Sequence, residues 1–387
     1  MGFTPEQAIT KLRLGDAKGV SAVDRLAALE TGEIEPTRPL LVKMAKQYRR
    51  PLLAFYMSAP PRRGERGQDF RTVQADDFSE TNALLDVLIR NVNARQGMVR
   101  SVLEDEDDAK PLEFVGSMEM AVGVPTIQAS IVSTIDLSLA EFREQSSPEL
   151  AFALLRSRAE AAGVFVLLMS NLGSYYTSID LEAYRGFTLS DEIAPFIVIN
   201  DQDSRAAWSF TLLHELTHLW LGQTGISGAR AVQVIEQFCN DVAAQFLLPA
   251  EELGELDVDD STNLELSMSR VSEFATHRNL SASLVAYNLF RVGAIGGGTW
   301  NHLSTAFRGL WFEQRSDQRE KARTQEGGPD YYVVRRHRVG TALISLASRA
   351  IADGSMTTSQ AGRALGVKAK NVHQLLESAA PGAGSLS

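Results

Sequence analysis

The run TLLHELTHLW at residues 211–220 constrains the fold of this chain more than any other stretch. His214 and His218 stand four positions apart, and Glu215 follows the first of them, which gives the pattern HExxH. Positions i and i+4 lie on one face of an α-helix. The flanking letters FTLL and LWLG are apolar, so both sides of this helix favour burial, and an unpaired pair of imidazoles would be costly there. We therefore predict a buried helix over residues 204–222 that offers both imidazoles to one ion.

The ligand set that this helix needs can be completed from the next predicted helix, residues 231–249. A tetrahedral catalytic zinc takes three protein ligands and leaves one position for water. Glu236 lies on that second helix, after the Gly-rich stretch GQTGISG, and a loop of this kind allows two helices to run antiparallel. We predict that Zn²⁺ is bound by His214, His218 and Glu236.

Three neighbouring residues receive auxiliary assignments. Glu215 projects beside the histidine face, where it can take a proton from a metal-bound water, so it is the predicted general base. Asn240 follows Glu236 by one helical turn and can accept the outer N–H of a ligating histidine. Cys239 is a softer rival ligand, but we assign it to the core because its helical phase differs from that of Glu236 and buried cysteine is common.

The remaining sequence alternates between helical and short apolar segments. Strands are predicted at residues 164–170 and 194–200, within long helical stretches. We predict an α+β fold that is mostly helical. Its expected divisions are a helical head (1–60), a linker (61–75), a domain with a small sheet (76–255, core 145–255), a helical C-terminal region (256–380) and a disordered tail (381–387).

A family resemblance rests on the segments around the histidine pair. FTLLHELTHLWLG followed by IEQFCNDVAAQFLLP resembles the ImmA/IrrE family of bacterial metallopeptidases, in which HExxH precedes E-x-x-A-N and a Leu-Leu-x-Pro helix end. YRGFTLSDEIAPFIVINDQD resembles the strand pair beside the metal in that family. The resemblance covers about residues 145–255. It implies a zincin-like domain with His214, His218 and Glu236 as zinc ligands and Glu215 as general base. It also implies that the substrate is a repressor of the Xre type, whose cleavage relieves repression. Cys239 stands where the family usually has Ala.

The head shows a second resemblance. LAALETGEIEPTRPLLVKMAKQYRRPLLAFYMSAPP resembles the end of an Xre/Cro-type helix-turn-helix domain. Residues 1–71 hold 13 Lys and Arg against 8 Asp and Glu, whereas the rest of the chain holds 25 against 40. A basic head on an acidic body is compatible with DNA binding, and the candidate phosphate contacts are Lys43, Lys46, Arg49 and Arg50. The stretch before LETGE is too short for a clean pair of DNA-scanning helices, so a role in holding partner proteins or the peptidase domain stays open.

Two other classes of function remain as alternatives. In the first alternative the chain is a DNA-binding regulator whose peptidase fold is a sensor or scaffold. In the second it is an antitoxin-like protein that binds a partner. If it is an endopeptidase, an extended substrate is expected to pair with an exposed strand edge, and PFIVIND is the candidate. A single cysteine and the absence of a long apolar run predict a cytoplasmic protein with no membrane partner.

Overall fold

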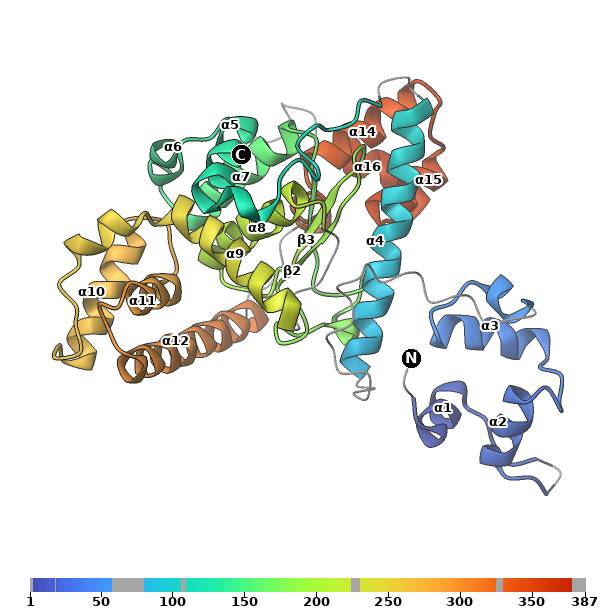
Figure 1. Ribbon diagram of the computed structural model, residues 1–387. Helices are drawn as coiled ribbons and strands as arrows, with labels where there is room; N and C mark the ends of the chain where they lie inside the picture. Colours follow the sequence, from blue (N-terminus) through green and yellow to red (C-terminus); the bar gives the residue numbers. More distant parts are fainter. Residues whose placement is uncertain are drawn as a thin grey trace.

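The computed structural model describes residues 3–17, 19–57, 80–105, 109–223, 230–324 and 330–377. The predicted linker (61–75) and tail (381–387) lie outside the described residues, as does most of the Gly-rich stretch between the two site helices. Helices predominate, with one small sheet, so the predicted α+β, mostly helical fold is confirmed (Figure 1).

A three-stranded sheet forms the centre of the fold. It consists of β1 (Phe165–Leu168), β2 (Gly186–Leu189) and β3 (Phe196–Ile199) in the order β1-β3-β2. β1 runs parallel to β3, and β2 pairs antiparallel with β3. PFIVIND was expected to be an exposed edge, and this prediction is wrong because β3 is the central strand. β2 is the edge strand instead.

Helical layers cover both faces of the sheet (Figure 1). Successive strand residues point to opposite faces, so Val166 and Ile197 join one hydrophobic cluster while Phe165 and Phe196 join the other. The first face packs with α5 (Val124–Ile135), α6 (Leu139–Arg143), α7 (Pro148–Ala161), α8 (Arg205–Trp220) and α9 (Arg230–Leu247). The second packs with α4 (Glu80–Asp105), α14 (Thr341–Ala352), α15 (Thr358–Leu365) and α16 (Val372–Glu377). Burial on both sides explains why the strands are apolar throughout rather than alternating.

The helix that carries the histidines is buried along most of its length. α8 begins after Ser204, and its residues from Trp208 to Trp220 are buried except Phe210. It packs against α7, α9 and β2. α9 ends at Leu247, two residues before Pro249, which cannot continue a helix.

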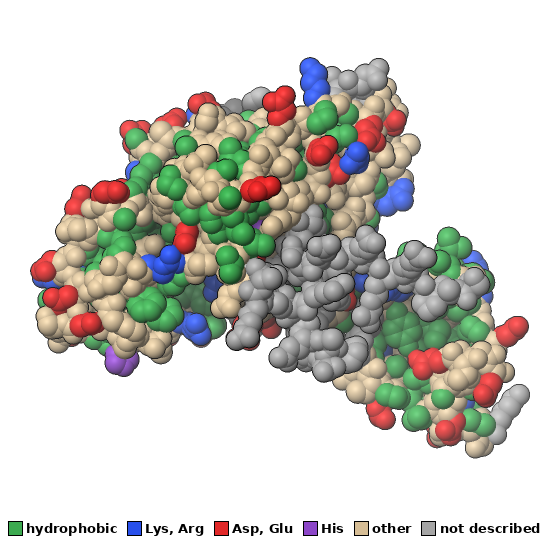
Figure 2. Space-filling model, viewed as in Figure 1, with side chains coloured by type: hydrophobic (Ala, Val, Ile, Leu, Met, Phe, Trp, Pro, Cys, Tyr) green, Lys and Arg blue, Asp and Glu red, His purple; other side chains and the backbone are tan. Residues whose placement is uncertain are grey.

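The residues after 255 contribute to both layers. α10 (Leu264–Thr276), α11 (Ala282–Arg291) and α12 (Gly297–Thr324) add residues such as Val271, Leu284 and Leu303 to the cluster that contains α8. α13 (Tyr331–Val339) and α14 to α16 pack with the opposite cluster. Acidic side chains are scattered over the face seen in Figure 2 rather than gathered into one patch.

The head forms a small helical unit with its own core. It contains α1 (Pro5–Leu12), α2 (Ala22–Glu30) and α3 (Arg38–Gln47), followed by a 3₁₀ turn at Leu52–Phe55. Its buried apolar residues are Ala8, Leu12, Leu26, Leu41 and Met44.

Candidate metal centre

Two imidazoles and a carboxylate converge between α8 and α9. His214 Nε2 lies 3.2 Å from His218 Nε2 and 3.1 Å from Glu236 Oε2. His218 Nε2 lies 3.3 Å from Glu236 Oε1. Ligands about 2.0–2.1 Å from one tetrahedral ion stand about 3.3–3.4 Å apart, so the spacing of these atoms fits a single zinc ion. The structure thus brings together the three residues that the sequence nominated as ligands.

The electrostatics of this group also favour a cation. His214 and His218 are 7% and 5% exposed. Burial opposes ionisation of Glu236, but hydrogen bonds with the two histidines outweigh it and lower the pKa of the carboxyl. His218 Nδ1 is buried and has no hydrogen-bond partner among the described residues. A buried carboxylate beside two nitrogen donors is a donor set that a divalent ion satisfies.

Glu215 lies next to the ligands and is held by the edge strand. It is 3% exposed, and Thr188 Oγ1 on β2 donates a hydrogen bond of 2.8 Å to Glu215 Oε2. Burial raises the pKa of the Glu215 carboxyl, and the two histidines oppose that rise. A carboxylate in this position can accept the proton of an attacking water and return it to a leaving group.

Gly186 on β2 explains how the edge strand can pass so close to α8. A Cβ at this position would stand 2.7 Å from Glu215 Oε1 and 2.7 Å from Thr211 Cγ2. Gly186 and Thr188 were not singled out from the sequence, although both lie in the stretch GFTL. Only the pairing of β2 with β3 and its contact with α8 reveal their role.

Asn240 lies against the outer side of the first histidine. Its Oδ1 is 3.0 Å from His214 Nδ1. A ring nitrogen that donates to this oxygen leaves Nε2 free to bind a metal, which is the geometry that the predicted orienting role requires.

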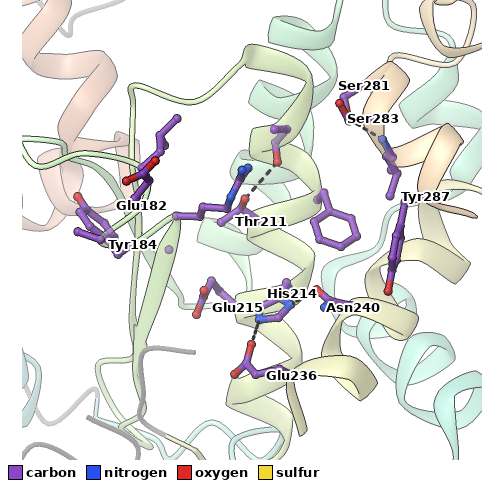
Figure 3. A pocket seen from close by; sticks show the side chains of 17 residues that line it. Glu182, Tyr184, Thr211, His214, Glu215, Glu236, Asn240, Ser281, Ser283 and Tyr287 are labelled. Carbon is purple, nitrogen blue, oxygen red and sulfur yellow. Dashed lines mark hydrogen bonds and ion pairs between the residues drawn. The ribbon is translucent and has the colours of Figure 1, made fainter. Parts of the chain in front are cut away.

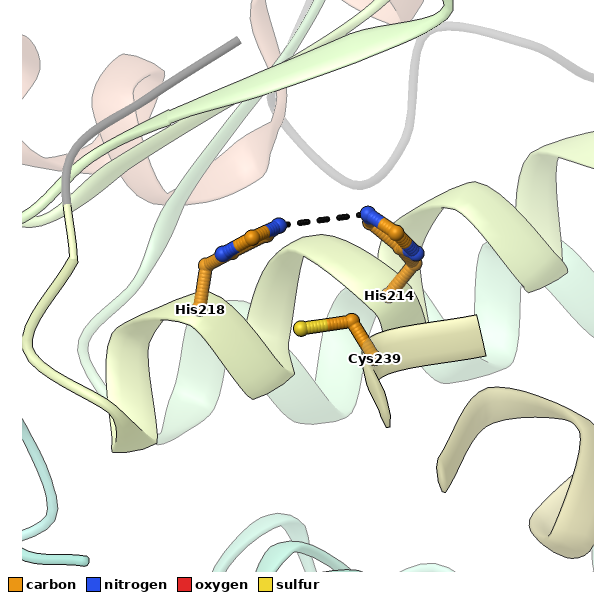
Figure 4. Close-up of side chains that lie close together, drawn as sticks. All are labelled: His214, His218 and Cys239. Carbon is orange, nitrogen blue, oxygen red and sulfur yellow. Dashed lines mark hydrogen bonds between the residues drawn. The ribbon is translucent and has the colours of Figure 1, made fainter. Parts of the chain in front are cut away.

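Cys239 is buried, as a core residue would be, but it also faces the histidines. Its Sγ and one ring nitrogen of each histidine lie within 4.8 Å of one another (Figure 4). The phase argument that set it apart from Glu236 was wrong, because residues three apart on a helix lie on neighbouring parts of one face.

A cavity of about 590 Å³ opens beside Glu215 and His214. Glu236, Asn240 and Tyr287 of α11 also line it, and Figure 3 shows Glu236 and Asn240 next to His214. Phe210 and Leu284 add apolar surface. This space is large enough for more than one amino-acid side chain and leads directly to the predicted base.

The candidate DNA contacts all lie at the end of the head. Lys43 and Lys46 are on α3, and Arg49 and Arg50 follow it. Lys46 is exposed, whereas the other three are half-buried, and burial lowers the pKa of Arg49. No described contact distinguishes a DNA surface here from an ordinary basic surface.

A histidine-bearing helix beside a small mixed sheet, with a carboxylate on the next helix, is an arrangement that can bind a metal ion. Residues 159–290 match the model of a peptidase family, Peptidase M78, described as the IrrE N-terminal-like domain. The matched segment contains all three strands and all of the site residues on α8 and α9, and it covers roughly a third of the chain. No curated protein and no solved structure matches the chain.

None of the described helices is long and apolar enough to cross a membrane.

Proposed function

We propose that this protein is a zinc-dependent endopeptidase. The observation that carries the proposal is the convergence of His214, His218 and Glu236 within 3.1–3.3 Å of one another, with Glu215 beside them. The match of residues 159–290 to a peptidase family supports it independently.

The chemistry follows from the position of each side chain. A zinc ion bound by the two histidines and Glu236 would lower the pKa of a bound water and polarise the scissile carbonyl. Glu215 takes the proton of the attacking water and passes it to the leaving amine. Thr188 fixes the orientation of the Glu215 carboxylate, and Asn240 fixes that of the His214 ring.

The substrate backbone pairs with β2. Asn200 N donates to Arg185 O, so Arg185 and Asn200 form a hydrogen-bonded pair. Such pairs alternate along antiparallel strands, so Gly186 and Thr188 point their backbone groups away from β3. Among the described residues no further strand pairs with that side of β2. A peptide added there would run past Glu215, with side chains reaching the 590 Å³ cavity.

A repressor of the Xre type is the proposed substrate, and relief of repression is the proposed outcome. This step rests on the resemblance to the ImmA/IrrE family. Strand addition alone reads the backbone and is permissive, so the head (1–60) and the helices after 255 are the surfaces available to select one target.

The decisive experiment uses the full chain and a purified helix-turn-helix repressor of the Xre type, chosen first from the genes next to its own. We expect one zinc per chain and a single cut in the repressor, located by mass spectrometry. A chelator should abolish the cut, and added zinc should restore it. Zinc-free protein prepared without chelator, or an unchanged cut after the histidine substitution His214→Ala, would contradict the proposal.

DNA binding by the head is a separate proposal, based on its basic charge. Because phosphate contacts release counterions, affinity for the gene's upstream DNA should fall steeply with salt. Lys46→Ala should reduce the slope of log affinity against log salt concentration by about one. Absence of any binding at low salt would leave the head as a protein-binding unit.

A further inference from the structure

The one cysteine of the chain lies inside the candidate metal centre. Cys239 is fully buried on α9, three residues after Glu236. Figure 4 shows its side chain beside those of His214 and His218. The sulfur and a nitrogen from each ring lie within 4.8 Å of one another. The Glu236 carboxylate contacts the same two histidines, at 3.1 Å and 3.3 Å.

The Cys239 thiol is in hydrogen-bonding contact with the side chain of His218. His218 is 5% exposed, so this contact lies away from water. Ala or Ser would fill a similar space on α9. What the thiol adds is a soft, polarisable donor atom, and thiolate is among the usual ligands of zinc.

We propose that Cys239 is a fourth metal ligand, which closes the coordination of the ion in the resting protein. The inference rests on the proposed metal site. In a tetrahedral site a thiolate about 2.3 Å from zinc stands about 3.6 Å from each ligating nitrogen. From within 4.8 Å, Sγ reaches that position by a movement on the order of 1 Å.

Four protein ligands leave no position for the attacking water. Most of the resting protein therefore holds its metal closed to water, and cleavage comes from the fraction of molecules in which Cys239 has left the ion. The metal–sulfur bond breaks in that exchange, and the entering water gives one proton to Sγ. The sulfur departs as a thiol, and no oxidant is involved.

Cobalt substitution tests this directly. Thiolate bound to Co²⁺ gives an intense charge-transfer absorption in the near ultraviolet, whereas imidazole and carboxylate ligands give only weak visible bands. Because the chain has one cysteine, such an absorption identifies Cys239. We expect it in the cobalt-loaded full chain. Cys239→Ala and Cys239→Ser should both lose it while keeping the visible bands, and circular dichroism should verify that each variant is folded.

Three outcomes separate the inference from the proposed function. Ultraviolet and visible bands in the unmodified chain, with only the former lost in Cys239→Ser, support it. Visible bands without the ultraviolet absorption overturn it but leave the metal site intact. Failure of the folded chain to take up cobalt or zinc overturns both. With zinc bound, Cys239→Ala should cut the repressor faster than the unmodified chain, and equal rates would contradict the closed resting state.

Discussion

Two buried polar clusters in this protein differ in whether their members satisfy one another. Arg156 and Glu160, both on α7, form an ion pair of 3.0 Å with side chains 8% and 4% exposed. Arg156 also donates to the carbonyls of Val166 and His337, and Glu160 accepts from Thr341 N at 2.9 Å and from Ala342 N at 3.0 Å. The cluster around His214, by contrast, leaves His218 Nδ1 without a partner among the described residues, and it brings two ring nitrogens and a carboxylate together.

This difference distinguishes a buried polar cluster that stabilises the fold from one that is a candidate active site. The Arg156 cluster is complete within the chain, and it joins α7 and β1 to the N-terminus of α14. The histidine cluster instead directs Nε2 of both rings and the Glu236 carboxylate toward one another, which is a donor set for a cation. A cluster that needs a ligand to satisfy its polar groups is the better candidate for an active site. Four predictions test this comparison.

The largest effect is expected for Glu215→Gln. The amide keeps the size of the side chain and leaves the three ligands in place, but it cannot accept the proton of water. Repressor cleavage should fall about 10²–10⁴-fold, while zinc content and melting temperature stay unchanged. A variant that cleaves as fast as the unmodified chain would show that Glu215 is not the base.

In the complete cluster, Glu160→Ala should damage stability rather than metal binding. It leaves Arg156 buried without its carboxylate and removes the acceptor at the start of α14, at a cost of about 3–5 kcal/mol in the free energy of unfolding. Denaturant titration measures the loss. Glu149→Ala, a change on the same helix that removes only an exposed ion pair with Arg205, is the control and should cost about 1 kcal/mol or less. Loss of zinc from folded Glu160→Ala would break the distinction between the clusters.

Asn240→Ala should weaken zinc binding about 10–100-fold, because His214 loses the acceptor that orients its ring. Competition with a coloured chelator measures this affinity. Asn240→Asp keeps an oxygen at the same position and should retain most of it. Equal zinc affinities for Asn240→Ala and the unmodified chain would show that Asn240 does not orient the His214 ring for metal binding.

The smallest effect concerns a third, partly exposed cluster. Burial opposes ionisation of Glu252, but hydrogen bonds from Arg143 and Arg278 lower the pKa of its carboxyl. A carboxyl whose folded pKa lies below its unfolded value contributes stability above the unfolded pKa, and that contribution is lost as pH falls through the folded pKa. Glu252→Gln should therefore lower the stability by about 1 kcal/mol or less near neutral pH, and the difference should vanish at acidic pH. Melting curves across pH measure it, and a difference independent of pH would refute the assignment.

The sequence predicted the local parts of this structure well and the long-range parts poorly. The helical spacing of His214 and His218 follows from the chain itself, and the helix carrying Glu236 was predicted from its apolar period. The order of the strands did not follow, because β2 and β3 pair through contacts that no local pattern encodes. For the same reason the hydrogen bond from Thr188 to Glu215 and the closeness of Gly186 were missed.

Residues far apart in the chain explain the remaining surprises. Glu160 accepts a hydrogen bond from Thr341, 181 positions away in the chain, and no sequence pattern near either residue predicts that contact. Cys239 was misjudged at short range, because a difference of 60° in helical phase was taken as a difference of face.

Because the sheet is buried on both faces, the matched segment cannot easily be transferred to another protein by itself. The matched segment, residues 159–290, contains the chemistry, but α4 and α13 to α16, which cover one face of its sheet, lie outside it. Transplanted alone into another protein, the segment would expose Phe165, Phe196 and Val198 to water. A recombination event that transfers this segment must therefore also transfer the flanking helices, or the recipient must supply others in their place. The segment that defines the family is thus shorter than the segment that can be exchanged between proteins.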